Sequence, residues 1–142
     1  MIGRSVLPLK PAHPQMSGMN PVNLALVLAL DCSASVYFDE FNLLANGCAA
    51  GLRDAEVRAG LLGPPFGASA IALLLWSGVG AQAVAVDWTV VSTPAELEGF
   101  ALLVEEVSRA VPAGATAIGE ALLVAEKLLA MAPRRASRQV IA

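Results

Sequence analysis

A chain of 142 residues is long enough for one domain with a hydrophobic core, and 56% of its residues are hydrophobic against 15% charged. The net charge of −3 provides no basic surface for nucleic acid, and no apolar run reaches the roughly 20 residues of a membrane-spanning helix. So apolar a chain should bury strands on both faces, which favours an α/β fold with a parallel sheet between helices. Cys32 and Cys48 are too few for a disulfide framework and are expected to be buried thiols.

Residues 1–21 contain four prolines and no apolar period, which predicts a flexible N-terminal arm. His13, the only histidine of the chain, lies in this arm, so the sequence excludes a Ser-His-Asp triad or a histidine-rich zinc site in the core. A basic start ahead of an apolar run has the outline of a secretory leader. Asp31, however, stands where leader cleavage needs a small neutral residue.

Residues 22–142 predict strands and helices in alternation. Residues 22–30 are apolar except for Asn23, which indicates a central strand, and a helix is expected to begin near Asp39 as its N-cap. A short second helical turn is expected before the next strand. Residues 69–76 and 83–91 predict two strands joined by a connection short enough for a hairpin, so the later one should be an antiparallel edge strand.

Thr93, Pro94 and Glu96 mark another helix start, since a threonine cap, a first-turn proline and a glutamate form a capping box. A further helix is predicted from about residue 118. Residues 139–142 look like the beginning of a fourth strand, and the sequence stops within it, so we expect a domain that is incomplete at its C-terminus. Three arginines between these last elements predict a solvated connection or a weak anion patch: Arg134, Arg135 and Arg138.

A carboxylate and two hydroxyls follow the central strand in the pattern Asp-x-Ser-x-Ser, at Asp31, Ser33 and Ser35. Such oxygen ligands suit Mg²⁺, which prefers six oxygens and keeps several waters. Open α/β sheets bind ligands at the carboxyl ends of their strands, which is where this loop falls. Neutral hydroxyls leave much of the cation's charge unbalanced, so the metal would attract a carboxylate from a partner. The competing interpretation is that the serines cap the following helix or form a turn.

The loop of residues 31–35 (Asp-Cys-Ser-Ala-Ser) resembles the first motif of the metal-ion-dependent adhesion site of von Willebrand factor type A domains. Residues 114–119 (Gly-Ala-Thr-Ala-Ile-Gly) resemble the second motif. More narrowly, residues 76–78, 87–89 and 116–121 are similar to an uncharacterised proteobacterial family of such domains, catalogued as a domain of unknown function. The resemblance covers nearly everything after the arm. It implies a Rossmann-like fold with a mostly parallel central sheet, one antiparallel edge strand and helices on both faces.

The resemblance also implies a ligand set. Ser33, Ser35 and Thr116 would bind Mg²⁺ directly, with Mn²⁺ or Ca²⁺ as alternative ions, and Asp31 would bind directly or through a water. The family has a third motif, an aspartate after the fourth strand, and this sequence ends where that motif would begin, so we expect weak metal binding. Cys32 alternates with the metal-facing serines and should point into the core.

These features favour a non-enzymatic protein-binding module that engages an acidic residue of a partner through Mg²⁺. A degenerate or truncated, metal-free scaffold is the first alternative. A haloacid dehalogenase-like phosphohydrolase is disfavoured because its acid/base aspartate would stand at position 33, which is Ser33. No glycine-rich nucleotide-binding pattern follows the first strand. The resemblance favours an exported or periplasmic protein, and an unpaired last strand would invite association with another chain.

Overall fold

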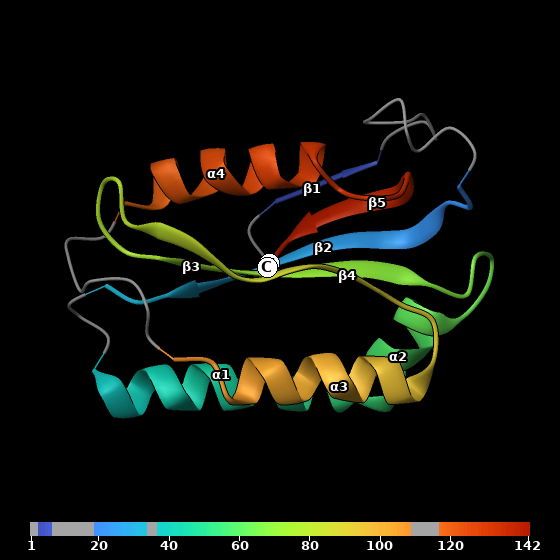
Figure 1. Ribbon diagram of the computed structural model, residues 1–142, viewed down its shortest axis with the longest axis horizontal. Coiled ribbons are helices and arrows are strands. Elements are labelled where there is room, and N and C mark those ends of the chain that lie inside the picture. The colour runs from blue at the N-terminus through green and yellow to red at the C-terminus, as the bar shows by residue number, and fades with distance from the viewer. Residues whose placement is uncertain (1–2, 7–18, 34–36, 109–116) are drawn as a thin grey trace.

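The fold was analysed in a computed structural model that describes residues 3–6, 19–33, 37–108 and 117–142. These residues form a mixed sheet in the order β1-β5-β2-β3-β4 with helices on both faces (Figure 1), which confirms the predicted α/β class. The strands are β1 (Gly3–Val6), β2 (Val22–Asp31), β3 (Ser69–Trp76), β4 (Gln82–Val91) and β5 (Ala136–Ile141). The helices are α1 (Phe38–Arg53), α2 (Ala55–Leu62), α3 (Pro94–Glu105) and α4 (Ile118–Ala130).

β2 is the central strand, as predicted, and runs parallel to both of its neighbours, β5 and β3. Alternate side chains of a strand point to opposite faces, so a strand that is apolar throughout needs cover on both sides. Leu26, Leu28 and Leu30 pack with the layer of α1, α2 and α3, whereas Ala25 and Val27 pack toward α4. Burial on both faces explains why residues 24–30 of this strand are all apolar.

β4 forms the antiparallel edge that the short connection predicted. The turn from β3 is closed by hydrogen bonds from Ser77 N to Ala81 O (2.9 Å) and from Ala81 N to Gly78 O (3.0 Å). Gly80 has a φ of 73°, a conformation that glycine adopts without the steric cost of a Cβ. The hairpin places the end of β3 beside the start of β4 and fixes the loop between them.

A second antiparallel pair lies at the other edge, where β1 pairs with β5 from Gly3–Ile141 to Val6–Arg138. The strand falls within the stretch predicted as an arm and gives four of its residues a place in the sheet. An unpaired edge beside the last strand is therefore not found, because β1 occupies it. β5 begins at Ala136, earlier than predicted, because its first half is polar and lacks the apolar signal on which the prediction rested.

The helix starts agree with the sequence except at α1. Thr93 Oγ1 accepts a hydrogen bond from Glu96 N (3.1 Å), and Glu96 Oε1 accepts one from Ser92 N (3.1 Å), so the predicted capping box is present with its return bond displaced by one residue. α1 begins one residue before Asp39, which lies in the first turn and is not the N-cap. Tyr37 takes that place and makes no side-chain cap hydrogen bond.

α1 and α3 lie side by side beneath the sheet in Figure 1 and are joined by an ion-pair cluster. Arg53 Nε lies 2.9 Å from Glu98 Oε2, and Arg53 Nη2 lies 2.7 Å from Glu105 Oε2. The guanidinium hydrogen bonds lower the pKa of Glu98. No helix within the described ranges is long and apolar enough to cross a membrane.

The two cysteines differ in burial. Cys32 is fully buried and packs in the core cluster shared with α1 and α3, which confirms that it points into the core. Cys48 on α1 is half-buried, and burial raises the pKa of its thiol. Both are free thiols, in keeping with the absence of a disulfide framework in the described residues.

Candidate metal site

Asp31 is the last residue of β2 and stands beside Trp76, the last residue of β3, in the parallel register. Its carboxylate is half-buried, and Oδ1 accepts a hydrogen bond from Ser33 N at 2.7 Å. This local bond folds the chain back over the strand end in the manner of an Asx turn. Because an ionised carboxylate offers about four lone-pair positions, Asp31 keeps acceptor capacity for a cation.

Ser33 is fully buried, which is unusual for a hydroxyl and places it among the few buried polar residues described. Cys32, between Asp31 and Ser33, donates its N–H to Trp76 O at 2.7 Å and so continues the pairing of β2 with β3 for one residue beyond Asp31. The first motif is therefore fixed to the strand end by its backbone. Ser35, its last predicted ligand, lies outside the described residues.

The described part of the second motif comes to the same edge of the sheet. Thr116 lies outside the described residues, but Ala117, the next residue along, donates its N–H to Ser77 O at 3.0 Å. The carbonyls of Trp76 and Ser77 thus accept hydrogen bonds from Cys32 and from Ala117. Two consecutive carbonyls at the end of β3 each accept a hydrogen bond from one of the two motifs, although the motifs lie far apart in the sequence.

Glu120, in the first turn of α4, anchors this helix start to the β3–β4 hairpin. Its Oε1 accepts hydrogen bonds from Gly80 N (2.6 Å) and from Gln82 Nε2 (3.1 Å). A glutamate one turn into a helix also interacts favourably with the helix dipole. The sequence assigned no role to Glu120, although it lies inside the stretch that resembles the bacterial family, because its partners are on a distant hairpin.

Trp76 adds a polar group that the motifs do not account for. It shares a face with Asp31 because residues opposite each other in a parallel pair point the same way. Its Nε1 is buried, and no acceptor for it is found within the described part of the chain. A buried donor without a partner costs about 1–3 kcal/mol. The indole N–H of Trp76 is such a donor, and it lies beside Asp31 on the face of the sheet that α4 covers.

The donor chemistry at this edge is mostly neutral. Among the described residues, no three histidine, cysteine, aspartate or glutamate side chains gather to hold a metal. A cation here would rely on Asp31 and on hydroxyl oxygens, which suits Mg²⁺ with retained waters better than Zn²⁺, which takes nitrogen and sulfur ligands. The described part of the predicted ligand set, Asp31 and Ser33, fits that chemistry.

Large apolar side chains surround this edge. Figure 1 shows the start of α1, the β3–β4 turn and the start of α4 at the same end of the molecule. Each contributes at least one exposed apolar residue next to a motif or to the hairpin turn: Tyr37 (72% exposed), Phe38 (67%), Val79 (85%) and Ile118 (51%).

Comparison with known proteins returned no match among curated sequences. The chain is similar to the vWF domain of the type V pili tip protein Mfa5 from Porphyromonas gingivalis, with 18% identity and a TM-score of 0.49. That match covers 80% of this chain and 34% of the other. A structure of three N-terminal domains of Mfa5 matches with 15% identity and a TM-score of 0.49, covering 93% of this chain and 25% of the other. This chain thus spans about a third or a quarter of those proteins.

The first of these two structures is described as a von Willebrand factor domain. A family model described as "Protein of unknown function (DUF1194)" matches residues 21–142, which is all of the chain after the N-terminal segment. The chain belongs to this family, as the narrower resemblance predicted.

Proposed function

We propose that this protein is a non-enzymatic protein-binding module that holds a divalent cation, with Mg²⁺ the first choice, at the carboxyl ends of β2 and β3. The cation would be held by Asp31, Ser33, Ser35 and Thr116. The observation that carries the proposal is the pair of hydrogen bonds that ties Cys32 and Ala117 to adjacent carbonyls of β3. These bonds hold one residue of each sequence motif at the same strand end, and open α/β sheets bind ligands at such ends.

The chemistry of the donor set supports an open site. One carboxylate and three hydroxyls neutralise only part of a 2+ charge, so an acidic side chain from a partner would complete the coordination. When bound, the cation would supply the positive charge that attracts this carboxylate. Asp31 is held in place for that role by its hydrogen bond to Ser33 N.

The apolar rim supports a protein partner. Protein interfaces combine aromatic and aliphatic contacts with a small number of desolvated charged groups near their centre. Tyr37 and Phe38 follow the first motif, and Ile118 lies within the second, so apolar contacts would enclose the acidic side chain at the cation. The partner would therefore present an aspartate or glutamate flanked by apolar residues.

A metal-free scaffold is the second candidate. It is favoured by the mostly neutral edge, because among described residues no cluster of acidic, histidine or cysteine side chains is found there. In that case Asp31 and Ser33 would serve only to close the loop through the 2.7 Å hydrogen bond. A phosphohydrolase is disfavoured, because Ser33 occupies the acid/base position and is fully buried.

Calorimetric titration with Mg²⁺ and Mn²⁺ tests the proposal. The wild type should bind one equivalent, and Asp31→Asn should lose at least tenfold in affinity while keeping the acceptor for Ser33 N. Asp87→Asn is the matched control, since Asp87 is an exposed aspartate whose Oδ1 also accepts a nearby backbone N–H, from Trp88 at 2.7 Å. Equal affinity in both variants, or no binding by the wild type, would leave the metal-free scaffold as the answer. Turnover of a phosphate ester that is lost in Asp31→Asn would instead indicate an enzyme.

A further inference from the structure

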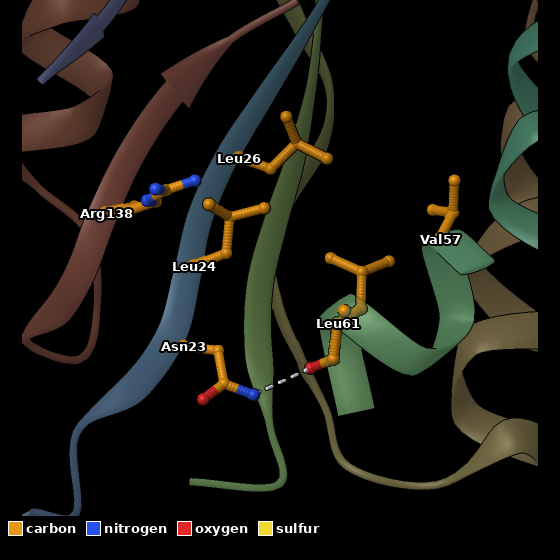
Figure 2. Close-up of a pocket in the computed structure, with 7 residues that line it drawn as sticks. Asn23, Leu24, Leu26, Val57, Leu61 and Arg138 are labelled. Carbon is orange, nitrogen blue, oxygen red and sulfur yellow. Dashed lines mark hydrogen bonds between the residues drawn. The ribbon is translucent and has the colours of Figure 1, made fainter. Parts of the chain in front are cut away.

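A cavity of about 310 Å³ lies toward the amino end of β2, away from the candidate metal site (Figure 2). Its walls come from β2, α2 and β5, three segments that are separate in the sequence. Leu24 and Leu26 of β2 form one side, and Val57 and Leu61 of α2 form the other. These four apolar side chains would favour an apolar ligand.

One charged side chain stands at the rim. Arg138 pairs with Leu24 in the register between β5 and β2, so the two side chains share one face of the sheet, and Figure 2 shows the Arg138 side chain extending from β5 toward β2. The residue is exposed, and no carboxylate among the described residues forms an ion pair with it. A cationic group thus borders an apolar cavity without an internal counter-charge.

The cavity is held open by hydrogen bonds that do not use Arg138. Asn23 Nδ2 donates to Gly63 O (2.7 Å) and Leu61 O (3.4 Å), and Asn23 Oδ1 accepts from Phe66 N (3.1 Å). These bonds fix the end of α2 against β2, so the space between them exists before any ligand binds. Because the amide of Asn23 is already engaged, Arg138 is the group that remains to orient a polar ligand.

Gly60 leaves part of the cavity wall without a side chain. It lies inside α2, where glycine costs about 1 kcal/mol relative to alanine. A Cβ added at Gly60 would meet no atom within 4 Å, so packing does not demand glycine there. The position therefore offers a way to fill the cavity by substitution without disturbing the fold.

We propose that this cavity binds a small monocarboxylate with an unbranched apolar chain, its carboxylate on Arg138 and its chain between β2 and α2. A planar guanidinium pairs with a carboxylate through two parallel hydrogen bonds. At roughly 30 Å³ per methylene-sized group, which is the volume of a water molecule in the liquid, the cavity holds about ten non-hydrogen atoms. Octanoate has that size.

The surroundings favour a small ligand over a protein. A stable protein interface buries about 800 Å² on each side. Of the large apolar residues that are exposed in the described part of the chain, Val57 is the one that lines this cavity, and the others lie elsewhere. The cavity lining therefore contributes a single exposed large apolar side chain to the surface, which is little for a protein partner to cover.

Isothermal titration with octanoate, 1-octanol and acetate, at pH 7 and with EDTA present, tests this assignment. Octanoate should bind with a dissociation constant of about 1 mM or lower, and octanol and acetate at least tenfold more weakly. Failure of octanoate to bind, or equal binding of octanol, would overturn the proposal. A peptide with an apolar C-terminal residue that binds tighter than octanoate would overturn it in favour of a protein partner. Because EDTA removes divalent cations, octanoate that binds under these conditions cannot be bound to a cation at the proposed metal site.

Variants locate the binding. Arg138→Gln should weaken octanoate at least tenfold and leave octanol unchanged, whereas Arg134→Gln, whose guanidinium donates to Asn20 O, is the control. Gly60→Leu should abolish binding, and Gly60→Ala should weaken it with a side chain small enough to leave the fold intact. Gly47→Leu is the matched control, because Gly47 is an exposed glycine of α1 with equally open space around it. Unchanged affinity in Arg138→Gln and in both Gly60 variants would place octanoate elsewhere and refute the assignment.

Discussion

The two ends of β2 present opposite chemistry on one strand. The carboxyl end has an acidic group, Asp31, beside a buried hydroxyl, and would attract a cation. The amino end has apolar walls and one guanidinium, that of Arg138, and would attract an anion with an apolar chain. Between them the strand is buried on both faces. The two proposed sites would therefore lie at opposite ends of one buried strand, with their charged groups supplied by Asp31 of β2 and by Arg138 of β5.

The largest expected effect comes from a substitution in the core, which should destabilise the whole fold and so disturb both ends of β2. Leu73 is fully buried in the middle of β3, next to Leu28 of β2. Leu73→Ala should lower the free energy of unfolding by about 2–5 kcal/mol, because it removes buried methylene groups and leaves a cavity. Leu123→Ala, at an exposed position of α4, should change it by less than about 0.5 kcal/mol. Urea denaturation measures both, and similar midpoints for the two variants would contradict the assigned core.

Asn23→Ala should disturb the cavity at the amino end of β2 and leave the candidate metal site intact. It removes the hydrogen bonds to Gly63 O, Leu61 O and Phe66 N, which we expect to lower the free energy of unfolding by about 1–3 kcal/mol. Octanoate affinity should fall with it, while Mg²⁺ affinity stays unchanged. Asn42→Ala, an exposed asparagine of α1, is the control. A parallel loss of Mg²⁺ affinity would show that the two ends are coupled.

Glu120→Ala should disturb the candidate metal site at the carboxyl end of β2 and leave the cavity intact. Loss of its bonds to Gly80 N and Gln82 Nε2 frees the start of α4 from the hairpin and should cost about 1 kcal/mol. Mg²⁺ affinity should fall several-fold, because Thr116 stands two residues before the first residue of this helix in the sequence, and octanoate affinity should not change. Glu126→Ala, at an exposed position of the same helix, is the control. Identical Mg²⁺ affinities for the two variants would show that the start of α4 does not contribute to the metal site.

The smallest effect concerns the layer that α1 and α3 form beneath the sheet. Arg53 lowers the pKa of Glu98, so the ion pair stabilises the folded state above the usual carboxyl pKa of about 4.3. That contribution is lost as pH falls through the lower pKa of the folded state. Arg53→Met should flatten the acid side of the stability profile slightly, because the pair is partly exposed. An unchanged profile below pH 5 would show that the pair contributes nothing measurable.

The fold was accessible from the sequence wherever one segment carried its own signal. The apolar run of β2, the hairpin after β3 and the capping box at Thr93 each depend on neighbouring residues, and each was predicted. β1 was missed because a short polar strand forms only when β5 offers a free edge. The start of β5 was missed because Ser137 and Arg138 are polar and give no apolar signal.

The candidate metal site and the cavity also differ in how far they could be predicted from the sequence. Asp31 and Ser33 belong to one contiguous motif, so they could be predicted as metal ligands from the sequence without the fold. The cavity at the other end was not predicted, because Leu24, Gly60 and Arg138 come from separate elements and none is unusual alone. Glu120 was missed because its hydrogen-bond partners lie about 40 residues away.

Paramagnetic broadening by Mn²⁺ in an amide NMR spectrum tests the central claim most directly, because it reports where a cation binds. At substoichiometric Mn²⁺, the amide signals of Cys32, Ser77 and Ala117 should broaden, whereas those of Gly60 and Arg138 should stay sharp. Excess Mg²⁺ should reverse the broadening. Broadening centred on Glu98 and Glu105, or no selective broadening at all, would contradict a cation site at the carboxyl end of β2.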